Sequence, residues 1–359
     1  MIFPVILAGG TGTRFWPKSR SRIPKQFLDF VTPESLLQAT KRRLNRLSDR
    51  EQIYVVTNRR YVNKVLEQLT CLPSSNVIVE PLRRDTATCI GLATSKLSTV
   101  DPEGVMVIVP SDHYVADEER FLKTLCRGVE AAQRRKSIVT LGINPYSPKT
   151  GYGYIEQGEF IEEYSDALAV YKANRFTEKP SLETAKEYLD SGRFYWNCGI
   201  FICRVSVMLE AIHRHMPRLA KGLDKIKSSI GTPQETEVVK KEYRDMEKVS
   251  IDYGIMEKAS NIEVIPCEFG WDDVGSWSIL DNMLIKDNCG NAVKGNCVNI
   301  DTNNCIIDSD GNRLVATIGV DDLIIVNTKD VVLVCRKDKD QEVKELVKKV
   351  KEPRFRRYW

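Results

Sequence analysis

Short apolar runs alternate with amphipathic stretches through the first part of the chain. The apolar runs predict buried strands at residues 2–7, 53–57, 77–79, 105–109 and 138–142, and the amphipathic stretches predict helices at 35–47, 61–69, 86–97 and 118–135. Strands that are apolar on both faces and alternate with helices are typical of a parallel sheet covered by helices on both sides. Ligands of such sheets bind beyond the carboxyl ends of the strands, so the residues after each strand are the first candidates for a site.

The pattern changes twice further along the chain. From about residue 151 it predicts a mixture of strands (152–156, 171–178, 199–203, 262–267) and helices (181–191, 205–215, 234–246, 253–259). Residues 288–334 are rich in Asn, Asp, Gly, Val and Ile in short runs between turn signals, which predicts a small all-β unit, and residues 340–351 form a last amphipathic helix. We therefore expect an α/β domain at residues 1–285 and a small β unit with a terminal helix at 286–359.

Composition narrows the class of protein. The 359 residues are 42% hydrophobic and 28% charged, as in a globular protein with a real core, and the net charge of +4 gives no reason to expect a nucleic-acid partner. No apolar stretch approaches the roughly 20 residues of a membrane span. The first apolar run lacks a preceding positive charge, so it predicts a strand rather than a signal peptide.

The ten cysteines include no C-x-x-C pair, and there are only three histidines. A zinc site is therefore not expected, and the cysteines are interpreted as reduced, mostly buried thiols of a cytoplasmic protein. The even spacing of Cys289, Cys297 and Cys305 predicts packing inside a repetitive β segment.

The strongest local feature is LAGGTGTRFWPKSRSRIPKQ, directly after the first strand. It lacks both the G-K-[ST] of a P-loop and the third glycine of the dinucleotide-binding fingerprint. Gly9, Gly10 and Gly12 would let backbone N–H groups converge on a triphosphate. Arg14 would add a rigid donor fork and Lys25 a mobile positive charge against the same phosphates.

Carboxylates follow two other predicted strands. Asp112 comes just after the strand at 105–109, and Asp272 and Asp273 lie in a glycine-bounded loop after the strand at 262–267. Mg²⁺ usually takes one or two carboxylates together with phosphate oxygens and water. One carboxylate from each loop would hold a metal ion that neutralises charge and aligns the reacting groups. His113 is interpreted as structural, because an attacking phosphate is already anionic and requires no general base.

Three further segments have the chemistry of a carbohydrate site. GYGYI at 151–155 offers a backbone that a flat ligand can approach, FTEKP pairs Glu178 with Lys179, and WNCGIF supplies the amide of Asn197. Carboxylates and amides bind paired hydroxyls, and Lys179 would neutralise a sugar phosphate. Each segment alone is weak evidence, and their combination carries the interpretation.

Taken as a set, the motifs resemble the mannose-1-phosphate guanylyltransferase family of bacterial type. The matching stretches are LAGGTGTRFWP with PKQ, EPLRRDTAT, VPSDH, GYGYI, FTEKP, WNCGIF, SIDYGIMEK and GWDDVGSW, in this order. The resemblance covers residues 1 to about 280. It implies a Rossmann-like nucleotidyltransferase domain with a mixed, mostly parallel sheet and helices on both faces, followed by a small β domain of left-handed β-helix type. The fused isomerase domain of some members is not expected.

The resemblance also implies site residues. The GTP phosphates and base would be bound by Leu7, Ala8, Gly9, Gly10, Thr11, Gly12, Thr13, Arg14, Lys25, Glu80, Pro81, Arg84, Asp85, Thr86, Ser111 and Asp112, with Glu80 to Thr86 at the guanine. The sugar phosphate would be bound by Tyr152, Gly153, Glu178, Lys179, Asn197, Gly199 and Asp252. Arg14, Lys25, Asp112 and Asp273 would be catalytic, and Asp112 and Asp273 would hold Mg²⁺.

The implied reaction is attack by mannose 1-phosphate on the α-phosphorus of GTP, giving GDP-mannose and pyrophosphate. Two alternatives stay open: a guanylyltransferase for another sugar 1-phosphate, such as a manno-heptose 1-phosphate, and a non-catalytic regulatory subunit that binds nucleotide sugars. The chain departs from the family in the base segment, where it reads LRRDTATC, and at Cys198, where many members have Ser. A homodimer through the apolar strands of the β unit is a further expectation.

Overall fold

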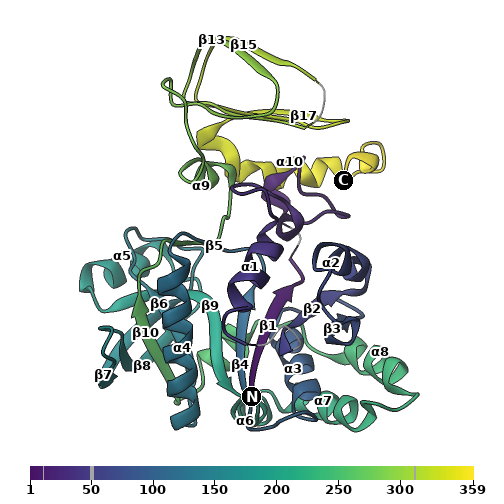
Figure 1. The fold of residues 1–359 in the computed structure, drawn as a ribbon, viewed down its shortest axis with the longest axis vertical. Helices are drawn as coiled ribbons and strands as arrows, with labels where there is room; N and C mark the ends of the chain where they lie inside the picture. The colour runs from purple at the N-terminus through teal and green to yellow at the C-terminus, as the bar shows by residue number, and fades with distance from the viewer. Residues whose placement is uncertain (11, 49–51, 311–312) are drawn as a thin grey trace. The chain divides into compact units, whose positions relative to one another are not determined.

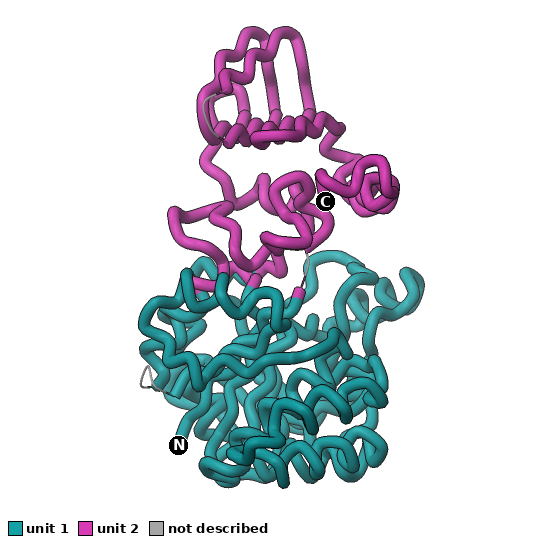
Figure 2. Tube along the Cα trace, turned by 90° about the vertical axis from the view of Figure 1, so that its right-hand side faces the viewer, with its two compact units in different colours: residues 1–9, 40–111, 115–271 teal, residues 10–39, 112–114, 272–359 magenta. Residues whose placement is uncertain are grey.

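The computed structural model describes residues 1–10, 12–48, 52–310 and 313–359. They divide into two compact units (Figure 2). Unit 1 comprises Met1–Gly9, Thr40–Ser111 and Val115–Trp271, and unit 2 comprises Gly10–Ala39, Asp112–Tyr114 and Asp272–Trp359. Three short elements lie where the chain passes between the units: α1 (Leu36–Leu44), β5 (Tyr114–Val115) and β11 (Trp271–Asp272).

Unit 1 is built on a nine-stranded sheet with the order β3-β2-β1-β4-β9-β6-β10-β8-β7. Neighbours among β1, β2, β3 and β4 are parallel, as are β6 and β10, whereas β9, β8 and β7 run antiparallel to their neighbours. The mixed, mostly parallel sheet is confirmed. The strands are β1 (Ile2–Ala8), β2 (Tyr54–Asn58), β3 (Val77–Glu80), β4 (Val105–Pro110), β6 (Ile138–Ile143), β7 (Tyr154–Glu163), β8 (Ala169–Thr177), β9 (Phe194–Arg204) and β10 (Ile262–Cys267).

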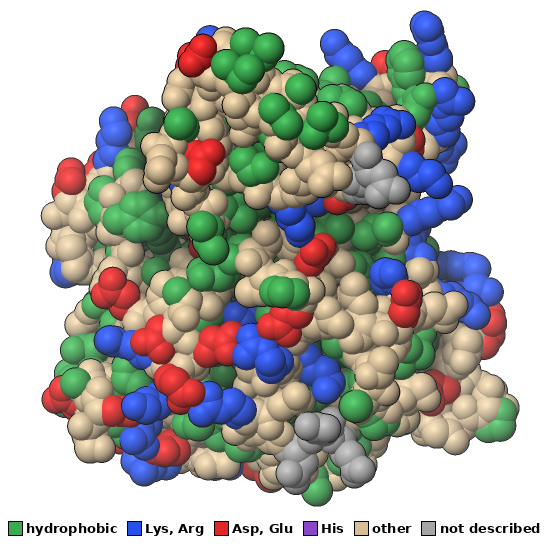
Figure 3. All heavy atoms as spheres, turned by 45° about the horizontal axis from the view of Figure 1, so that its top comes forward, with side chains coloured by type: hydrophobic (Ala, Val, Ile, Leu, Met, Phe, Trp, Pro, Cys, Tyr) green, Lys and Arg blue, Asp and Glu red, His purple; other side chains and the backbone are tan. Residues whose placement is uncertain are grey.

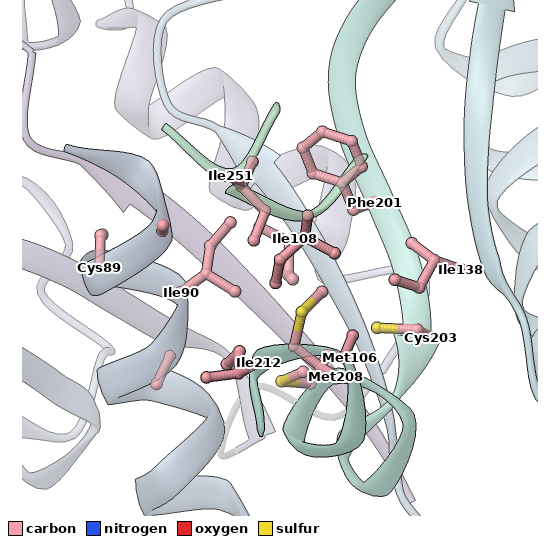
Figure 4. Close-up of a cluster of buried hydrophobic side chains, with 14 of the residues drawn as sticks. Cys89, Ile90, Met106, Ile108, Ile138, Phe201, Cys203, Met208, Ile212 and Ile251 are labelled. Atoms are coloured by element: carbon pink, nitrogen blue, oxygen red, sulfur yellow. The ribbon is translucent and has the colours of Figure 1, made fainter. Parts of the chain in front are cut away.

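Helices cover both faces of this sheet, as Figure 1 shows. On one face, α4 lies close against β9, since a Cβ added at Gly128 of α4 would lie 2.4 Å from the side chain of Ile202 in β9. On the other face, Phe201 and Cys203 of β9 belong to the core that α3, α6 and α7 complete (Figure 4). Successive residues of a strand point to opposite faces, so β9 contributes to both layers. The helices are α2 (Val62–Gln68), α3 (Thr86–Leu97), α4 (Glu118–Arg134), α5 (Leu182–Ser191), α6 (Val205–His215), α7 (Pro217–Ser229) and α8 (Glu235–Asp245).

Local chemistry explains where several helices begin. The side chains of Asp85, Asp117 and Ser181 accept hydrogen bonds from backbone N–H groups in the first turns of α3, α4 and α5. Pro217 stands at the start of α7, where its missing N–H costs nothing. The predicted helix at 253–259 is instead a π-helical turn at Asp252–Met256, and α7 was not predicted at all.

Unit 2 contains the predicted small β unit. Strands β12 (Ala292–Lys294), β14 (Ile306–Ser309), β16 (Leu323–Asn327) and β17 (Val332–Arg336) form one sheet, and β13 (Cys297–Asn303) and β15 (Val315–Asp321) form a second. Ile306 pairs in parallel with Ile324, and Cys297 with Val315. Both pairs have the same separation along the chain, so the chain makes one full coil between them, as in a β-helix. The C-terminal β domain of the predicted kind is confirmed; its handedness stays a prediction.

The core of unit 2 joins segments from its two ends. Phe15, Phe30 and Leu36 from the Gly10–Ala39 segment pack with α9 (Trp277–Asp281), the β strands and α10 (Val343–Val350). Trp277 is fully buried in this cluster. The segment after β1 therefore belongs to the same core as the C-terminal strands. The two compact units interleave along the sequence. The domain boundary expected at 285/286 stays a prediction.

The cysteines and the surface complete the picture. All ten cysteines are free thiols, and Cys89, Cys198, Cys203, Cys267 and Cys305 are buried. Cys289 is exposed, so the predicted burial of the evenly spaced cysteines fails there. Acidic, basic and hydrophobic side chains all occur on the face that Figure 3 shows. Among the described residues, no helix is long and apolar enough to span a membrane.

Candidate active site

The chain leaves unit 1 at the carboxyl ends of two neighbouring parallel strands. Gly9 follows β1, and Ser111 follows β4. The ends are joined, because the N–H of Ser111 donates to the carbonyl of Leu7 at 3.1 Å. The carbonyl of Ala8 accepts a hydrogen bond from the hydroxyl of Thr57 at 2.8 Å. The residues that continue these strands, Gly10 and Asp112, both belong to unit 2.

The glycine loop folds tightly against the segment that carries Lys25. Gly12 adopts a left-handed backbone with φ of 55°, and a Cβ at this position would lie 2.3 Å from the Cβ of Lys25. Only glycine fits so close to another backbone. The hydroxyl of Ser19 donates to the carbonyl of Gly12, and the amide of Gln26 donates to that of Gly10 at 3.3 Å. These hydrogen bonds hold the carbonyls of Gly10 and Gly12, and the side chain of Arg14 is exposed.

The ammonium of Lys25 links the loop to both aspartate segments. Its Nζ lies 2.8 Å from Oδ2 of Asp112 and donates to the carbonyls of Asp273 at 2.6 Å and Val274 at 3.2 Å. The Lys25 side chain is only 7% exposed. Burial opposes ionisation of Asp112, but the charges of Lys25 and His113 outweigh it and lower the pKa of Asp112 below its ordinary value. Asp112 is therefore an anion at neutral pH.

The oxygen atoms around Lys25 are of the kind that Mg²⁺ prefers. Asp112 offers a carboxylate, and the Asp273 segment reaches the same ammonium through its backbone. Oδ1 of Asp272 accepts the N–H of Val274 at 2.6 Å, which commits that side chain to the turn and favours Asp273 as the ligand. Among the described residues, no three His, Cys, Asp or Glu side chains cluster as a complete metal site. Two carboxylates fit a magnesium ion that also takes phosphate oxygens and water.

Glu80 lies at the end of β3, in unit 1, beside the start of the glycine segment. A Cβ on Gly9 would lie 3.6 Å from its Oε2. Oε1 of Glu80 accepts the hydroxyl of Tyr243, from α8, at 3.3 Å. Burial raises the pKa of Glu80 to about 7, against the smaller opposing effect of Tyr243. A buried carboxyl that can be protonated near neutral pH is a candidate for binding a base edge.

The segment after Glu80 is held by the chain around residues 243–251. Arg84 donates to the carbonyls of Tyr243 at 2.9 Å and Arg244 at 2.6 Å. Asp85, whose φ is 70°, caps α3, and the hydroxyl of Thr86 accepts the N–H of Ile251 at 2.8 Å. These contacts fix the shape of the segment. The assignment of Pro81, Arg84, Asp85 and Thr86 to the nucleotide stays a prediction.

The amino acids that three motifs predicted to bind the sugar phosphate lie close together in unit 1. A Cβ on Gly153 would lie 2.6 Å from Oε2 of Glu178, so a larger residue here would displace that carboxylate. The carbonyl of Gly153 accepts the N–H of Asn197 at 2.8 Å. The N–H of Glu178 donates to Oε1 of Glu257 at 2.9 Å, and its carboxylate pairs with Lys179. Burial lowers the pKa of Lys179, but the hydrogen bond and charge of Glu178 outweigh this effect and raise it.

The amide of Asn197 is oriented at both ends. Its oxygen accepts the N–H of Gly199 at 3.0 Å, and its nitrogen donates to Oδ1 of Asp252 at 3.1 Å. Gly199 has a φ of 71°, and the pairing of β6 with β9 shifts register at this level. Burial, followed by the charge of Glu178, raises the pKa of Asp252 to about 6. Gly153, Glu178, Asn197 and Asp252 thus form one polar cluster.

Not every predicted residue joins a cluster. The ring of Tyr152 packs against Trp196 and Trp271, and Trp196 points to the opposite face of β9 from Asn197. Thr13 lies in the short 3₁₀ turn η1 (Thr13–Phe15), and Thr11 lies outside the described residues. The assignments of Tyr152, Thr13 and Thr11 stay predictions.

Three residues with direct contacts to these groups were not predicted. Gln26 binds the loop carbonyl of Gly10, Tyr243 binds Glu80, and Glu257 binds the backbone of Glu178. Two signals pointed to them. Gln26 belongs to the PKQ motif, and Tyr243 is the single aromatic residue in the strongly polar helix α8.

Comparison with known proteins decides the family. A model described as "Nucleotidyl transferase" matches residues 3–287, and one described as "MannoseP isomerase/GMP-like beta-helix domain" matches residues 295–350. The chain belongs to the nucleotidyl transferase family. The two matches correspond to the large α/β sheet and to the C-terminal β unit.

Individual relatives of this nucleotidyl transferase are similar over long stretches. A mannose-1-phosphate guanylyltransferase of Salmonella montevideo is 39% identical over 295 residues, which cover 81% of this chain and 62% of the relative. This chain thus spans about three fifths of the length of that curated relative. A crystal structure from Thermus thermophilus, described as a mannose-1-phosphate geranyltransferase, has a TM-score of 0.87 and 34% identity over 98% of this chain and 99% of its own. A Helicobacter pylori structure described as a mannose-6-phosphate isomerase has a TM-score of 0.61 and 28% identity over 76% of this chain and 99% of its own.

Proposed function

We propose that this chain joins mannose 1-phosphate to GTP, releases pyrophosphate and forms GDP-mannose. The Salmonella montevideo relative carries the name of this activity. The single observation that carries the proposal is the contact of Lys25 with Asp112 and with the carbonyls of Asp273 and Val274, within a loop closed by Gly12. This arrangement supports the proposal, because a triphosphate is bound by a cation such as Lys25 and by a metal ion that carboxylates such as Asp112 and Asp273 can hold.

The residues of the loop and of its partners bind and neutralise the triphosphate. The N–H groups of Gly10 and Gly12 would bind phosphate oxygens, and the exposed guanidinium of Arg14 would bind them through two donors. Lys25 would exchange its present oxygen partners for the phosphates. Asp112 and Asp273 would hold Mg²⁺, which supplies charge neutralisation and alignment of the phosphates when it is bound.

The sugar 1-phosphate provides the nucleophile itself. Glu178, Asn197 and Asp252 would bind hydroxyl groups of mannose, and Lys179 would bind its phosphate. A phosphate oxygen then attacks the α-phosphorus of GTP in line with the departing pyrophosphate. No protein nucleophile and no general base are needed, so positioning and electrostatic stabilisation supply the rate.

The test is a substrate panel. The protein is incubated with Mg²⁺, one of GTP, ATP, UTP or dTTP, and one of mannose 1-phosphate, glucose 1-phosphate or a manno-heptose 1-phosphate, while pyrophosphate release is followed. We expect the highest kcat/KM for GTP with mannose 1-phosphate. A preference for the heptose would support the alternative guanylyltransferase. Binding of GDP-mannose without turnover of any pair would support a regulatory subunit instead.

An isomerase assay belongs beside the panel, because the Helicobacter pylori structure bears that name. The protein is incubated with mannose 6-phosphate, and fructose 6-phosphate is measured. The proposal predicts no conversion. Conversion without any nucleotide-dependent reaction would contradict it.

The apolar strands of the β unit support a proposed homodimer. Val298 and Ile300 on β13 and Ile318 on β15 are 53%, 55% and 70% exposed. Exposed apolar side chains on neighbouring strands favour association. Sedimentation of the wild-type chain and of a variant that carries Ile300→Ser and Ile318→Ser tests this association.

A further inference from the structure

The residues that follow the glycines of the loop, Phe15 and Trp16, are buried in unit 2. Phe15 and Trp16 are 1% and 6% exposed. The Phe15 ring lies 4.6 Å from that of Phe30 and 5.3 Å from that of Trp277, measured between centroids. All of these side chains share a core with β14, β16, β17 and α10. The FWP part of the motif therefore packs on C-terminal elements of the chain.

A buried ion pair makes a second connection. Nζ of Lys18 lies 2.6 Å from Oδ1 of Asp308, in β14, and 2.9 Å from Oδ1 of Asp310. Side chains of Lys18 and Asp308 are only 5% and 8% exposed. Burial lowers the pKa of Lys18, but the charges and hydrogen bonds of Asp308 and Asp310 outweigh it and raise the pKa. Lys18 is therefore a cation that depends on its carboxylate partners.

Further contacts continue this connection along the loop. Arg20 donates from two nitrogens to Asp330, at 2.8 and 2.5 Å, and from one of them to the hydroxyl of Thr328 at 3.1 Å. Nε1 of Trp16 donates to the carbonyl of Tyr358 at 2.9 Å. A bidentate arginine–carboxylate pair fixes orientation as well as distance. Residues 15–20 thus contact the C-terminal segment of unit 2, Asp272–Trp359, at several separate points.

These attachments flank the residues proposed to bind phosphate. Arg14 directly precedes Phe15 in η1, and Gly12 contacts the backbone of Lys25. A displacement of residues 15–20 would move both Arg14 and Gly12, because the chain between them is short. Electrostatic stabilisation of a triphosphate depends on donors that are already in place. The attachments therefore bear on phosphate binding, and not only on stability.

We propose that the C-terminal β unit is part of the catalytic apparatus, and that Lys18 and Asp308 are positioning residues that hold the glycine loop for phosphate binding. The inference rests on the proposed function of the loop. It gives a role to the FWPKSR part of the motif, which has none among the substrate contacts proposed above.

The experiment compares Lys18→Met with Lys337→Met in the full-length chain. Lys337 is a matched control, because its ammonium also contacts a buried carboxylate of unit 2, that of Asp281, at 2.8 Å. Neither Asp281 nor the second partner of Lys337, Asn304, belongs to the glycine loop. Dissociation constants for GTP and for guanosine are measured with Mg²⁺ present. Hydrogen exchange of the loop peptides is measured in the same samples. Asp308→Asn and the charge-swapped pair Lys18→Asp with Asp308→Lys complete the set.

We expect Lys18→Met and Asp308→Asn to weaken GTP binding at least tenfold and guanosine binding less than twofold, with faster exchange in the loop. The swapped pair should restore GTP binding to within about threefold of the wild type. Lys337→Met should change neither the dissociation constants for GTP and guanosine nor the hydrogen exchange of the loop peptides. Equal effects of Lys18→Met and Lys337→Met on both readouts would overturn the proposal.

Two further outcomes are informative. If the wild type does not bind GTP, the proposed function fails, while the exchange of the loop in Lys18→Met relative to Lys337→Met still decides whether the attachment holds the loop. If Lys18→Met does not fold, Arg20→Gln, which removes a more exposed attachment, replaces it in the same comparison. Unchanged GTP binding and loop exchange in Arg20→Gln would then count against the proposal.

Discussion

Asp112 and Asp273 can be tested residue by residue, because an Asp→Asn change keeps the shape and removes the charge. We expect Asp112→Asn and Asp273→Asn to fold normally and to lose about 10²–10³ in kcat, the range seen when one electrostatic contact of a transition state is removed. Thermal melting and steady-state kinetics measure the two effects. Asp272→Asn is the control, because its oxygen can still accept the N–H of Val274. Near-normal kcat in both variants would refute the metal assignment.

Gly153 and Gly151 offer a matched pair of substitutions in one short segment. A Cβ on Gly153 would collide with Oε2 of Glu178, whereas a Cβ on Gly151 would have nothing within 4 Å. We expect Gly153→Ala to displace Glu178 and to raise the KM for mannose 1-phosphate at least tenfold, with little change in the KM for GTP. Gly151→Ala should leave both constants within twofold. Equal KM values in the two variants would argue against a role of Glu178 in sugar binding.

At the scale of residues, chemical type predicts much of the sugar cluster but not its connections. Glu178 and Asn197 were expected from the hydrogen-bonding needs of a carbohydrate, and the structure brings them together with Gly153 and Asp252. Tyr243 was missed because its contact with Glu80 joins residues 163 positions apart. No local pattern encodes such a contact, because it depends on how the fold brings Tyr243 of α8 to Glu80 and to the carbonyl of Thr88 in α3.

Turning to elements, the glycine loop depends on one backbone conformation. Gly12→Ala would force a left-handed residue and a Cβ into contact with Lys25. We expect this variant to raise the KM for GTP at least tenfold through displacement of the loop. Gly192→Ala, at the end of α5, has a similar φ of 65° but nothing within 4 Å, so it should lose about 1 kcal/mol of stability and keep its activity. Denaturant titration and kinetics distinguish the two, and an unchanged KM in Gly12→Ala would contradict the loop assignment.

The junction of β3 with α8 makes a prediction about pH. Burial raises the pKa of Glu80 to about 7, above the 4.5 of an ordinary glutamate, so the folded state binds more protons than the unfolded state between these values. The free energy of unfolding that depends on Glu80 therefore falls as pH rises through this window. We expect Glu80→Gln to gain stability relative to the wild type between pH 5 and pH 8, by on the order of 3 kcal/mol at most.

Urea titrations at several pH values measure this difference. Glu67→Gln is the control, because Glu67 is an exposed partner of Lys64 and should change stability by less than about 0.5 kcal/mol at every pH. A pH-independent difference between Glu80→Gln and the wild type would show that Glu80 is not protonated in this range.

Periodicity predicted most elements of unit 1 to within a few residues, including α3, which has the predicted bounds. It failed where the hydrophobic signal was diluted. Helix α7 carries Gly222 and five charged residues, and its large apolar side chains are only Leu219, Leu223 and Ile226. Strand β9 begins at Phe194 rather than at residue 199, because its alternating pattern was divided by the glycine turn at Gly199.

On the scale of the whole molecule, the sequence pattern predicted two classes of structure but not how the chain divides between them. The texture change near residue 285 indicated the β unit. Nothing in that texture shows that Gly10–Ala39 packs in the same compact unit as Asp272–Trp359, because Phe15 and Trp277 meet across a long stretch of sequence. Arg14, Lys25, Asp112 and Asp273 all belong to this unit. The residues proposed for catalysis therefore belong to the same compact unit as the β strands of the C-terminal part.

The central claim is that this chain transfers a nucleotide to a sugar phosphate and does not merely bind or hydrolyse it. The most direct measurement is a ³¹P NMR time course of the wild-type protein with Mg²⁺, GTP and mannose 1-phosphate. We predict that the GTP and mannose 1-phosphate signals disappear together, while GDP-mannose and pyrophosphate appear in equal amounts. Release of inorganic phosphate without GDP-mannose, or unchanged substrate signals with a folded protein, would contradict the account.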